Sequence, residues 1–265
     1  MMISVAALQA PLGSGITLED KLHLLRHRTD FVCLPEYFFV KPTDRDYADG
    51  DSRTAQRLEE LQRFSRELSC TLIGGTIPQP VNGGYGNIST IFHRGTLIGC
   101  YQKVNPYGRE EQRGIVPGTE FRVFDIDGVR VGVLICADVL NRDSFVEMGR
   151  LGADVIFVPT VSPRRESDTV FEKDQRDATI FVAGAQLARA YIVKTCGVGT
   201  IFGHPLQGRS GIFAPWGILR RVPPDAESKK LLLTECLDIG EIREFKRMLA
   251  AETLEDVEQH RENSP

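Results

Sequence analysis

The sequence lacks the features that mark several large classes of protein. No apolar run approaches the roughly 20 residues that a membrane helix needs, and the N-terminal segment has no basic residues of the kind that open a signal peptide. The formal net charge of the 265 residues is only -4, with no charged block. We therefore expect a cytoplasmic protein that has neither a membrane nor a nucleic acid as its partner.

Paired cysteines are also missing. The six cysteines are scattered along the chain and none form C-x-x-C, which argues against a zinc or disulfide framework and for reduced thiols. His23 and His27 have the spacing of two metal ligands on one helical turn, but no third ligand lies near them in the sequence. The sequence therefore predicts no metal site.

Two common catalytic signatures are absent as well. The glycine-rich stretch from Gly197 to Gly203 misses the G-x-G-x-x-G spacing of dinucleotide-binding proteins by one residue. The segment around Ser210 does not match the G-x-S-x-G turn of serine hydrolases. No internal repeat or long linker is visible either. A single globular unit without a nucleotide fingerprint is expected.

Short apolar strands alternate with amphipathic helices along the chain. A helix is expected after Thr17, as its N-cap, and others at 52–69, 141–151 and 167–188. Strands recur between them, several as hairpins, as at 87–93 and 96–102. This alternation predicts an α/β fold in which the sheets are mixed.

Three chemically active residues each follow an apolar strand. Cys136 follows the run from Val131 to Ile135. Glu36 comes two residues after Leu34, the end of another apolar run, and Lys103 follows the strand that ends at Gln102. Strand ends on one edge of a sheet converge, so the three side chains could share a pocket. Each also has a simpler interpretation: a buried thiol, a carboxylate in a cap or ion pair, and a lysine at a sheet edge.

The order and spacing of three motifs decide between these interpretations. Leu34-Pro35-Glu36, then Tyr101-Gln102-Lys103 with Glu111 and Pro117-Gly118, then Val133 to Asp138 resemble the three motifs of the nitrilase superfamily, the carbon-nitrogen hydrolases. The resemblance covers residues 1–245, which we take as one domain, and leaves 246–265 as a charged C-terminal helix and tail. It implies a four-layer α-β-β-α sandwich that forms a homodimer or a larger homo-oligomer.

The resemblance also implies a role for each residue. Glu36 would take the thiol proton of Cys136, and the thiolate would attack an amide or nitrile carbon to form a thioester. Lys103, with the backbone N–H of Ala137, would stabilise the charged intermediate. No metal or organic cofactor is required. Asp138 after the cysteine resembles the amidase-like branches and favours a small-molecule amide over a nitrile.

Other pocket residues are less certain from the sequence. The resemblance implies a second carboxylate that orients substrate or water; we assign it to Glu111, whose spacing to Pro117-Gly118 fits the family pattern, with Glu110 as the rival. Arg164 and Arg165 follow a strand end, and one of them is a candidate to bind a substrate carboxylate, although a solvated pair is the simpler interpretation. Acyl transfer on the same site and a non-catalytic binding protein with this fold remain alternatives.

Overall fold

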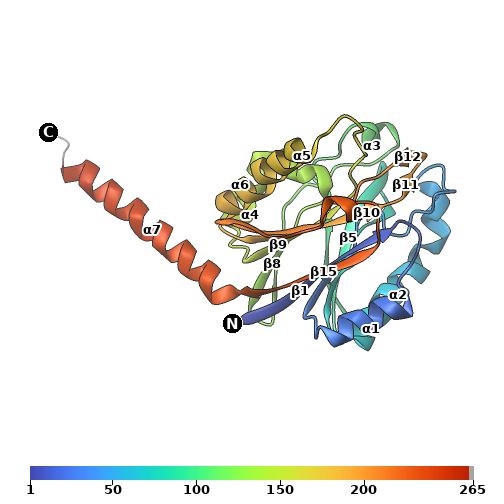
Figure 1. The fold of residues 1–265 in the computed structure, drawn as a ribbon, viewed down its shortest axis with the longest axis horizontal. Helices are drawn as coiled ribbons and strands as arrows, with labels where there is room; N and C mark the ends of the chain where they lie inside the picture. The colour runs from blue at the N-terminus through green and yellow to red at the C-terminus, as the bar shows by residue number, and fades with distance from the viewer. Residues whose placement is uncertain (263–265) are drawn as a thin grey trace.

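Two mixed β-sheets, joined at one point, form the centre of the molecule (Figure 1). The computed structural model describes residues 1–262, apart from the side chains of 50–52 and 252–262. One sheet contains β1 (Met2–Pro11), β2 (Phe31–Cys33), β3 (Thr71–Ile73), β4 (Ile77–Val81), β5 (Gly84–His93), β6 (Thr96–Gln102) and β15 (Leu231–Asp238). The other contains β7 (Val123–Ile126), β8 (Val129–Val133), β9 (Val155–Thr160), β10 (Tyr191–Val198), β13 (Gly211–Ala214) and β14 (Gly217–Arg221).

The two sheets meet where β1 and β10 pair in parallel, at Ala10 and Gly197. β2 runs parallel to β1, and two antiparallel steps through β5 give β6 the same direction. β8 and β9 run parallel to β10. The C-terminal ends of β2, β6, β8 and β9 therefore all lie at the same edge of the sheets.

Alternating side chains bury both faces of the central strands. Val5 of β1 and Phe157 of β9 point into the core between the two sheets. Leu8 of β1 and Ile156 of β9 point the opposite way, into two outer cores beneath the helices. Successive residues of these strands are therefore buried on one face or the other, which explains why the strands are apolar almost without interruption.

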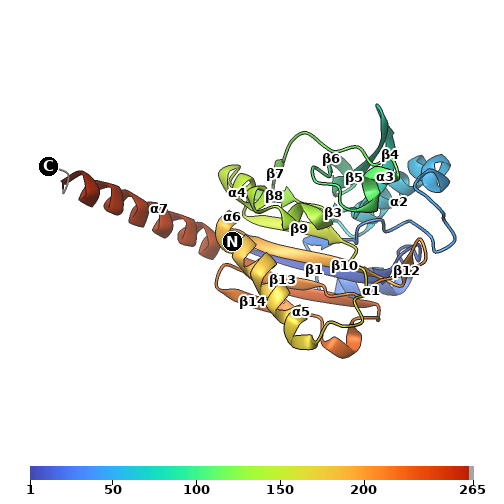
Figure 2. The ribbon, with the colours of Figure 1, turned by 90° about the horizontal axis from the view of Figure 1, so that it is seen from above.

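Helices cover the outer face of each sheet, as the two views show (Figures 1 and 2). α1 (Leu18–Arg26) and α2 (Thr54–Glu67) pack on the first sheet. α4 (Arg142–Arg150) and α6 (Ala183–Ala188) pack on the second. The predicted four-layer α-β-β-α sandwich is confirmed. The predicted N-cap is present too, since Thr17 and Asp20 form a reciprocal capping box, worth about 1 kcal/mol.

The expected single helix over 167–188 is interrupted. α5 (Val170–Asp177) is followed by one π-helical turn, Ala178–Val182, before α6 begins. Such a turn has a wider hydrogen-bond spacing and occurs often at functional sites. The amino-acid pattern does not indicate this turn, because the apolar residues on either side of it have the period of an ordinary helix. The polar segment 105–118, expected as a loop, also contains a short helix, α3 (Arg109–Gln112).

The last helix, α7 (Ile239–Glu262), starts on the sandwich and then projects away from it in both views. Its first turn belongs to the domain, because Ile239 and Ile242 are buried in the central core. Residues 263–265 of the predicted tail lie outside the described residues. No helix among residues 1–262 combines the length and the apolar character needed to span a membrane.

Candidate active site

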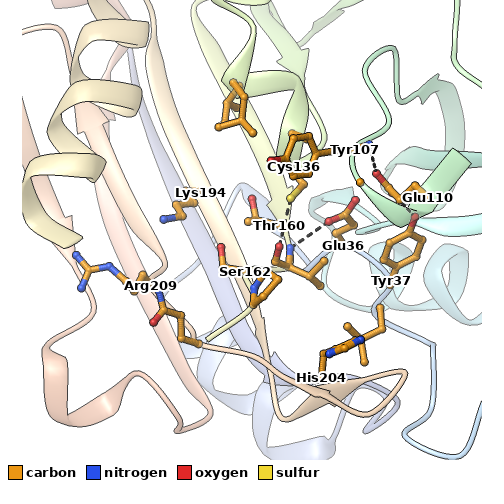
Figure 3. Close-up of a pocket in the computed structure, with 18 of the residues that line it drawn as sticks. Glu36, Tyr37, Tyr107, Glu110, Cys136, Thr160, Ser162, Lys194, His204 and Arg209 are labelled. Carbon is orange, nitrogen blue, oxygen red and sulfur yellow. Dashed lines mark hydrogen bonds between the residues drawn. The ribbon is translucent and has the colours of Figure 1, made fainter. Parts of the chain in front are cut away.

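A cavity of about 530 Å³ opens at the shared edge of strand ends (Figure 3). Glu36, Lys103 and Cys136, which follow β2, β6 and β8, all line it. The parallel directions of these strands bring the three residues together although they are far apart in the sequence. The end of β9 contributes Thr160 and Val161 to the same cavity.

Glu36 is fully buried, and both of its carboxylate oxygens accept hydrogen bonds. Oε1 accepts from Lys103 Nζ at 2.8 Å and from Asn87 Nδ2 at 2.9 Å. Oε2 accepts from the backbone N–H of Val161 at 3.1 Å. Three donors around one buried carboxylate fix its position and offset part of the cost of taking its charge out of water.

Lys103 links two carboxylates. Its ammonium donates to Glu36 Oε1 and, at 2.7 Å, to Glu110 Oε2. The other oxygen of Glu110 accepts from the Tyr37 hydroxyl and from Asn87 Nδ2. An ammonium has three N–H donors, so one donor of Lys103 is left over from these two bonds. A fixed cation with a spare donor is suited to stabilise an oxyanion.

The second carboxylate of the site is Glu110, not the preferred Glu111. Glu110 is held beside Lys103 by the bonds above, whereas Glu111 is exposed and does not line the cavity. The two residues are neighbours in α3, and consecutive helical residues point about 100° apart, so only one of them can face inward. The spacing to Pro117-Gly118 did not reveal which.

Cys136 lies in a strained turn. Its φ is 44°, in the left-handed region that residues with a side chain seldom adopt, at a cost of roughly 1–3 kcal/mol. Its Sγ donates to the carbonyl of Val161 at 3.2 Å, and the N–H of Val161 donates to Glu36, so the backbone of this one residue contacts both side chains (Figure 3). The thiol is thereby held next to the carboxylate.

Asp138 links this turn to the segment around Lys103. Its buried carboxylate accepts from the N–H of Ile135 at 2.9 Å, from the Tyr101 hydroxyl at 2.8 Å and from the N–H of Asn105 at 2.7 Å. These contacts explain why an acid stands two residues after the cysteine, because it joins the turn to the segment that follows Lys103.

Burial and neighbouring charges change the acidity of all three groups. Burial raises the pKa of the Glu36 carboxyl; the ammonium of Lys103 opposes this shift and the charge of Glu110 adds to it. Burial and the charge of Glu36 raise the pKa of the Cys136 thiol well above its ordinary value. Burial alone would lower the pKa of Lys103, but the charges of Glu36 and Glu110 outweigh it and raise that pKa. The unliganded site therefore combines a protonated thiol, a carboxylate with increased proton affinity and a charged ammonium.

Of the remaining predicted site residues, some line the cavity and one does not. Ala137 lines the cavity, and so does Arg165, which is exposed at its mouth. Arg164 does not line it; its backbone N–H pairs with the carbonyl of Pro205 instead. Among the described side chains, no cluster of three or more His, Cys, Asp or Glu residues is placed to hold a metal ion.

Sequence reasoning missed two residues that support the site. Asn87 lies within β5 and donates to both Glu36 and Glu110, and Tyr37, which follows Glu36 directly, donates to Glu110. The signal for Asn87 was a polar residue opening an apolar strand. The signal for Tyr37 was weaker, because two further aromatic residues stand beside it.

Several known proteins are similar to this chain in sequence or in fold. The chain is 26% identical over 236 residues to omega-amidase NIT2 of Homo sapiens, covering 82% of this chain and 80% of that protein. A carbon-nitrogen hydrolase from Helicobacter pylori G27 has the same fold, with a TM-score of 0.80 at 20% identity over 94% of this chain and 93% of that one. Nit3 of Saccharomyces cerevisiae, a member of branch 10 of the nitrilase superfamily, gives a TM-score of 0.74 at 21% identity, covering 93% and 94%.

The family assignment rests on the sequence match. The family described as carbon-nitrogen hydrolase matches residues 15–247, which include all three motifs and every residue of the site described above. This chain belongs to the carbon-nitrogen hydrolase family.

Proposed function

We propose that this enzyme hydrolyses the amide of a small molecule through a thioester on Cys136. The observation that carries the proposal is the backbone of Val161, whose carbonyl accepts from the thiol and whose N–H donates to Glu36. Together with the Lys103–Glu36 bond, it holds a nucleophile, a base and a cation around one cavity. This is the set of groups that acyl transfer to a thiol needs.

In the first half of the reaction, the Glu36 carboxylate takes the Sγ proton as sulfur attacks the carbonyl carbon. The oxygen becomes negatively charged, and the spare N–H of Lys103 and the N–H of Ala137 donate to it. Glu36 then gives its proton to the departing nitrogen, the C–N bond breaks, and ammonia or an amine leaves. A thioester remains on Cys136.

In the second half, water attacks the thioester carbonyl and Glu36 takes a proton from it. The tetrahedral intermediate collapses, the C–S bond breaks, and Glu36 returns the proton to sulfur. One amide and one water are consumed, and one carboxylic acid and one amine are released. The raised pKa of Glu36 suits it to act as base and acid in turn.

The nature of the substrate is supported by the relatives rather than by the geometry. The curated proteins that match over most of their length are named omega-amidases, and a structural neighbour from Nesterenkonia is an amidase that binds the acetamide moiety of fluoroacetamide covalently at its active-site cysteine. Nitrile hydrolysis and acyl transfer to an amine would use the same thioester. The homo-oligomer and the cytoplasmic location stay predictions.

A substrate panel tests the proposal. We expect the purified chain to release ammonia from aliphatic amides and ω-amides faster than from nitriles of the same length, followed by a coupled ammonia assay. Intact-mass spectrometry of the quenched reaction should show the acyl group on the protein. A folded enzyme that releases no ammonia and forms no acyl adduct would favour a binding protein with this fold.

Replacing Glu110 with glutamine should lower kcat/KM roughly 10- to 100-fold, because Lys103 loses one of its two charge-assisted hydrogen bonds. It should also shift the acid limb of the pH profile. The charge of Glu110 raises the pKa of Glu36, so its removal lowers that pKa, and the base stays ionised to a lower pH. The measurement is kcat/KM against pH.

Glu111→Gln is the matched control for this variant, since the neighbouring residue is exposed and outside the cavity. It should leave both the rate and the pH profile as in the wild type. If Glu111→Gln moves the profile and Glu110→Gln does not, the second carboxylate has been placed on the wrong residue.

A further inference from the structure

We propose that Lys194 and Gln207 form a second subsite of the same cavity, which binds a carboxylate at the far end of the amide substrate. The inference rests on the proposed function and adds its substrate class: the monoamide of a dicarboxylic acid. Both residues line the cavity that contains Cys136. Figure 3 shows Lys194 and Glu110 on opposite sides of Cys136.

Lys194 is a buried cation with donors to spare. It lies in the middle of β10, between Val158 of β9 and Gly211 of β13, and is only 5% exposed. Its ammonium donates to Asp177 Oδ1 at 2.9 Å and stands 4.6 Å from the centre of the Phe181 ring. Among the described residues no second acceptor bonds to it, so two of its three N–H donors are available to a ligand.

Gln207 provides an independent sign of a missing partner. It is 6% exposed and lines the cavity, and its buried Oε1 has no hydrogen-bond partner among the described residues. A buried amide oxygen without a donor costs free energy, so native sites usually supply the donor as a ligand or a water. Rotation of the amide by 180° exchanges Oε1 and Nε2, and the group can then donate to a carboxylate oxygen.

The charge of Lys194 is not cancelled by its own partner. Asp177 also accepts from Arg209, at 2.6 Å from Nη2 and 3.1 Å from Nε, so its one negative charge is shared by two cations. The ion pairs connected to Lys194 contain four cations and three carboxylates: Lys173, Lys194, Arg209 and Arg221 with Asp174, Asp177 and Glu227. An excess of one positive charge matches a monoanion such as a carboxylate.

The interrupted helix shapes this end of the cavity. The π-helical turn Ala178–Val182 begins directly after Asp177 and contributes Ile180 and Phe181 to the cavity wall. Asp177 thus reaches Lys194 from the end of α5, and the apolar side chains of Ile180 and Phe181 line the cavity that contains both Lys194 and Cys136. A substrate with its amide at Cys136, an aliphatic middle and a carboxylate at Lys194 fits a cavity with these charged and apolar walls.

Pairs of amides that differ only in the terminal group provide the test. Glutaramic acid is compared with pentanamide, and succinamic acid with butanamide, by kcat/KM in the wild type and in Lys194→Met. We expect the wild type to prefer the acid of each pair. The ratio of acid to neutral amide should fall roughly 10- to 100-fold in Lys194→Met, mainly through KM for the acid, as expected for the loss of a hydrogen bond to a charged group.

Two further variants complete the design. Lys229→Met, at an exposed lysine paired with Asp225, controls for a general change in charge and should keep the ratio of the wild type. Arg165→Ala tests the rival arginine at the cavity mouth. A ratio that collapses in Arg165→Ala but not in Lys194→Met would overturn the assignment to Lys194.

Ligand binding separates this inference from the proposed function. Calorimetry with Cys136→Ala should show glutarate binding at least 10-fold tighter than pentanoate, and this needs no turnover or substitution at Lys194. Glutarate binding without turnover of any amide by the wild type would support the subsite and contradict the proposed function. Turnover of acid and neutral amides at equal rates, with equal binding of glutarate and pentanoate, would overturn the subsite and leave the function standing.

Discussion

Replacement of Cys136 by alanine should abolish amide hydrolysis, with a loss in kcat of at least about 10⁴-fold, because Cys136 is the one thiol among the described residues that line the cavity. The protein should remain folded, since the side chain forms one hydrogen bond, to the carbonyl of Val161. Intact-mass spectrometry should show an acyl adduct on the wild type during turnover and none on the variant.

Cys100→Ala is the matched control for the nucleophile. Cys100 is an exposed thiol on β6, and its loss should change neither the rate nor the adduct. Residual turnover by Cys136→Ala within 100-fold of the wild type would contradict the thioester mechanism and favour direct attack by water.

Glu36→Gln should lower kcat by roughly 10³-fold or more, because the amide cannot accept the thiol proton, protonate the leaving nitrogen or activate water. The thiol itself should stay reactive. The charge of Glu36 raises the pKa of Cys136, so its removal lowers that pKa toward the range where the thiolate forms, with Lys103 still beside it. Alkylation of Cys136 by iodoacetamide is expected to be as fast as in the wild type, or faster.

A Glu36→Gln variant that loses turnover but keeps alkylation would show that Glu36 transfers protons and does not merely support the fold. Glu36 binds Lys103, Asn87 and the peptide of Val161, so a purely structural role would disturb the whole site. If Glu36→Gln loses alkylation and turnover to the same extent, with a lowered Tm, the residue holds the cavity together and is not the base. Lys103→Arg, which keeps the charge, serves as the comparison for a change in packing within the same cluster.

The three residues of the proposed mechanism could be predicted from the sequence. Each follows a short apolar run, and a strand buried on both faces is a local property that the run itself encodes. Because the strands before these residues run in the same direction in the two sheets, their ends lie at one edge. The order of Glu36, Lys103 and Cys136 with their neighbouring residues was therefore enough to identify the family.

The choice between neighbouring residues could not be predicted in the same way. Glu110 and Glu111, or Arg164 and Arg165, are alike in type and adjacent in the chain. Which of each pair faces the cavity depends on how α3 is oriented and on the backbone bond from Arg164 to Pro205. Those features depend on contacts with distant segments, and no local pattern records them.

The fold class, the three strand ends and the family follow from the amino-acid sequence alone, because they depend on the periodicity of apolar residues and on the order of short motifs. The positions of Asn87 and Glu110 beside Glu36 and Lys103, and of Lys194 in the same cavity, come from the packing of distant segments. A lysine within an apolar strand does not by itself indicate a binding role. The role proposed for Lys194 follows from α5, β9 and β10, which place its ammonium beside Asp177 at the cavity of Cys136.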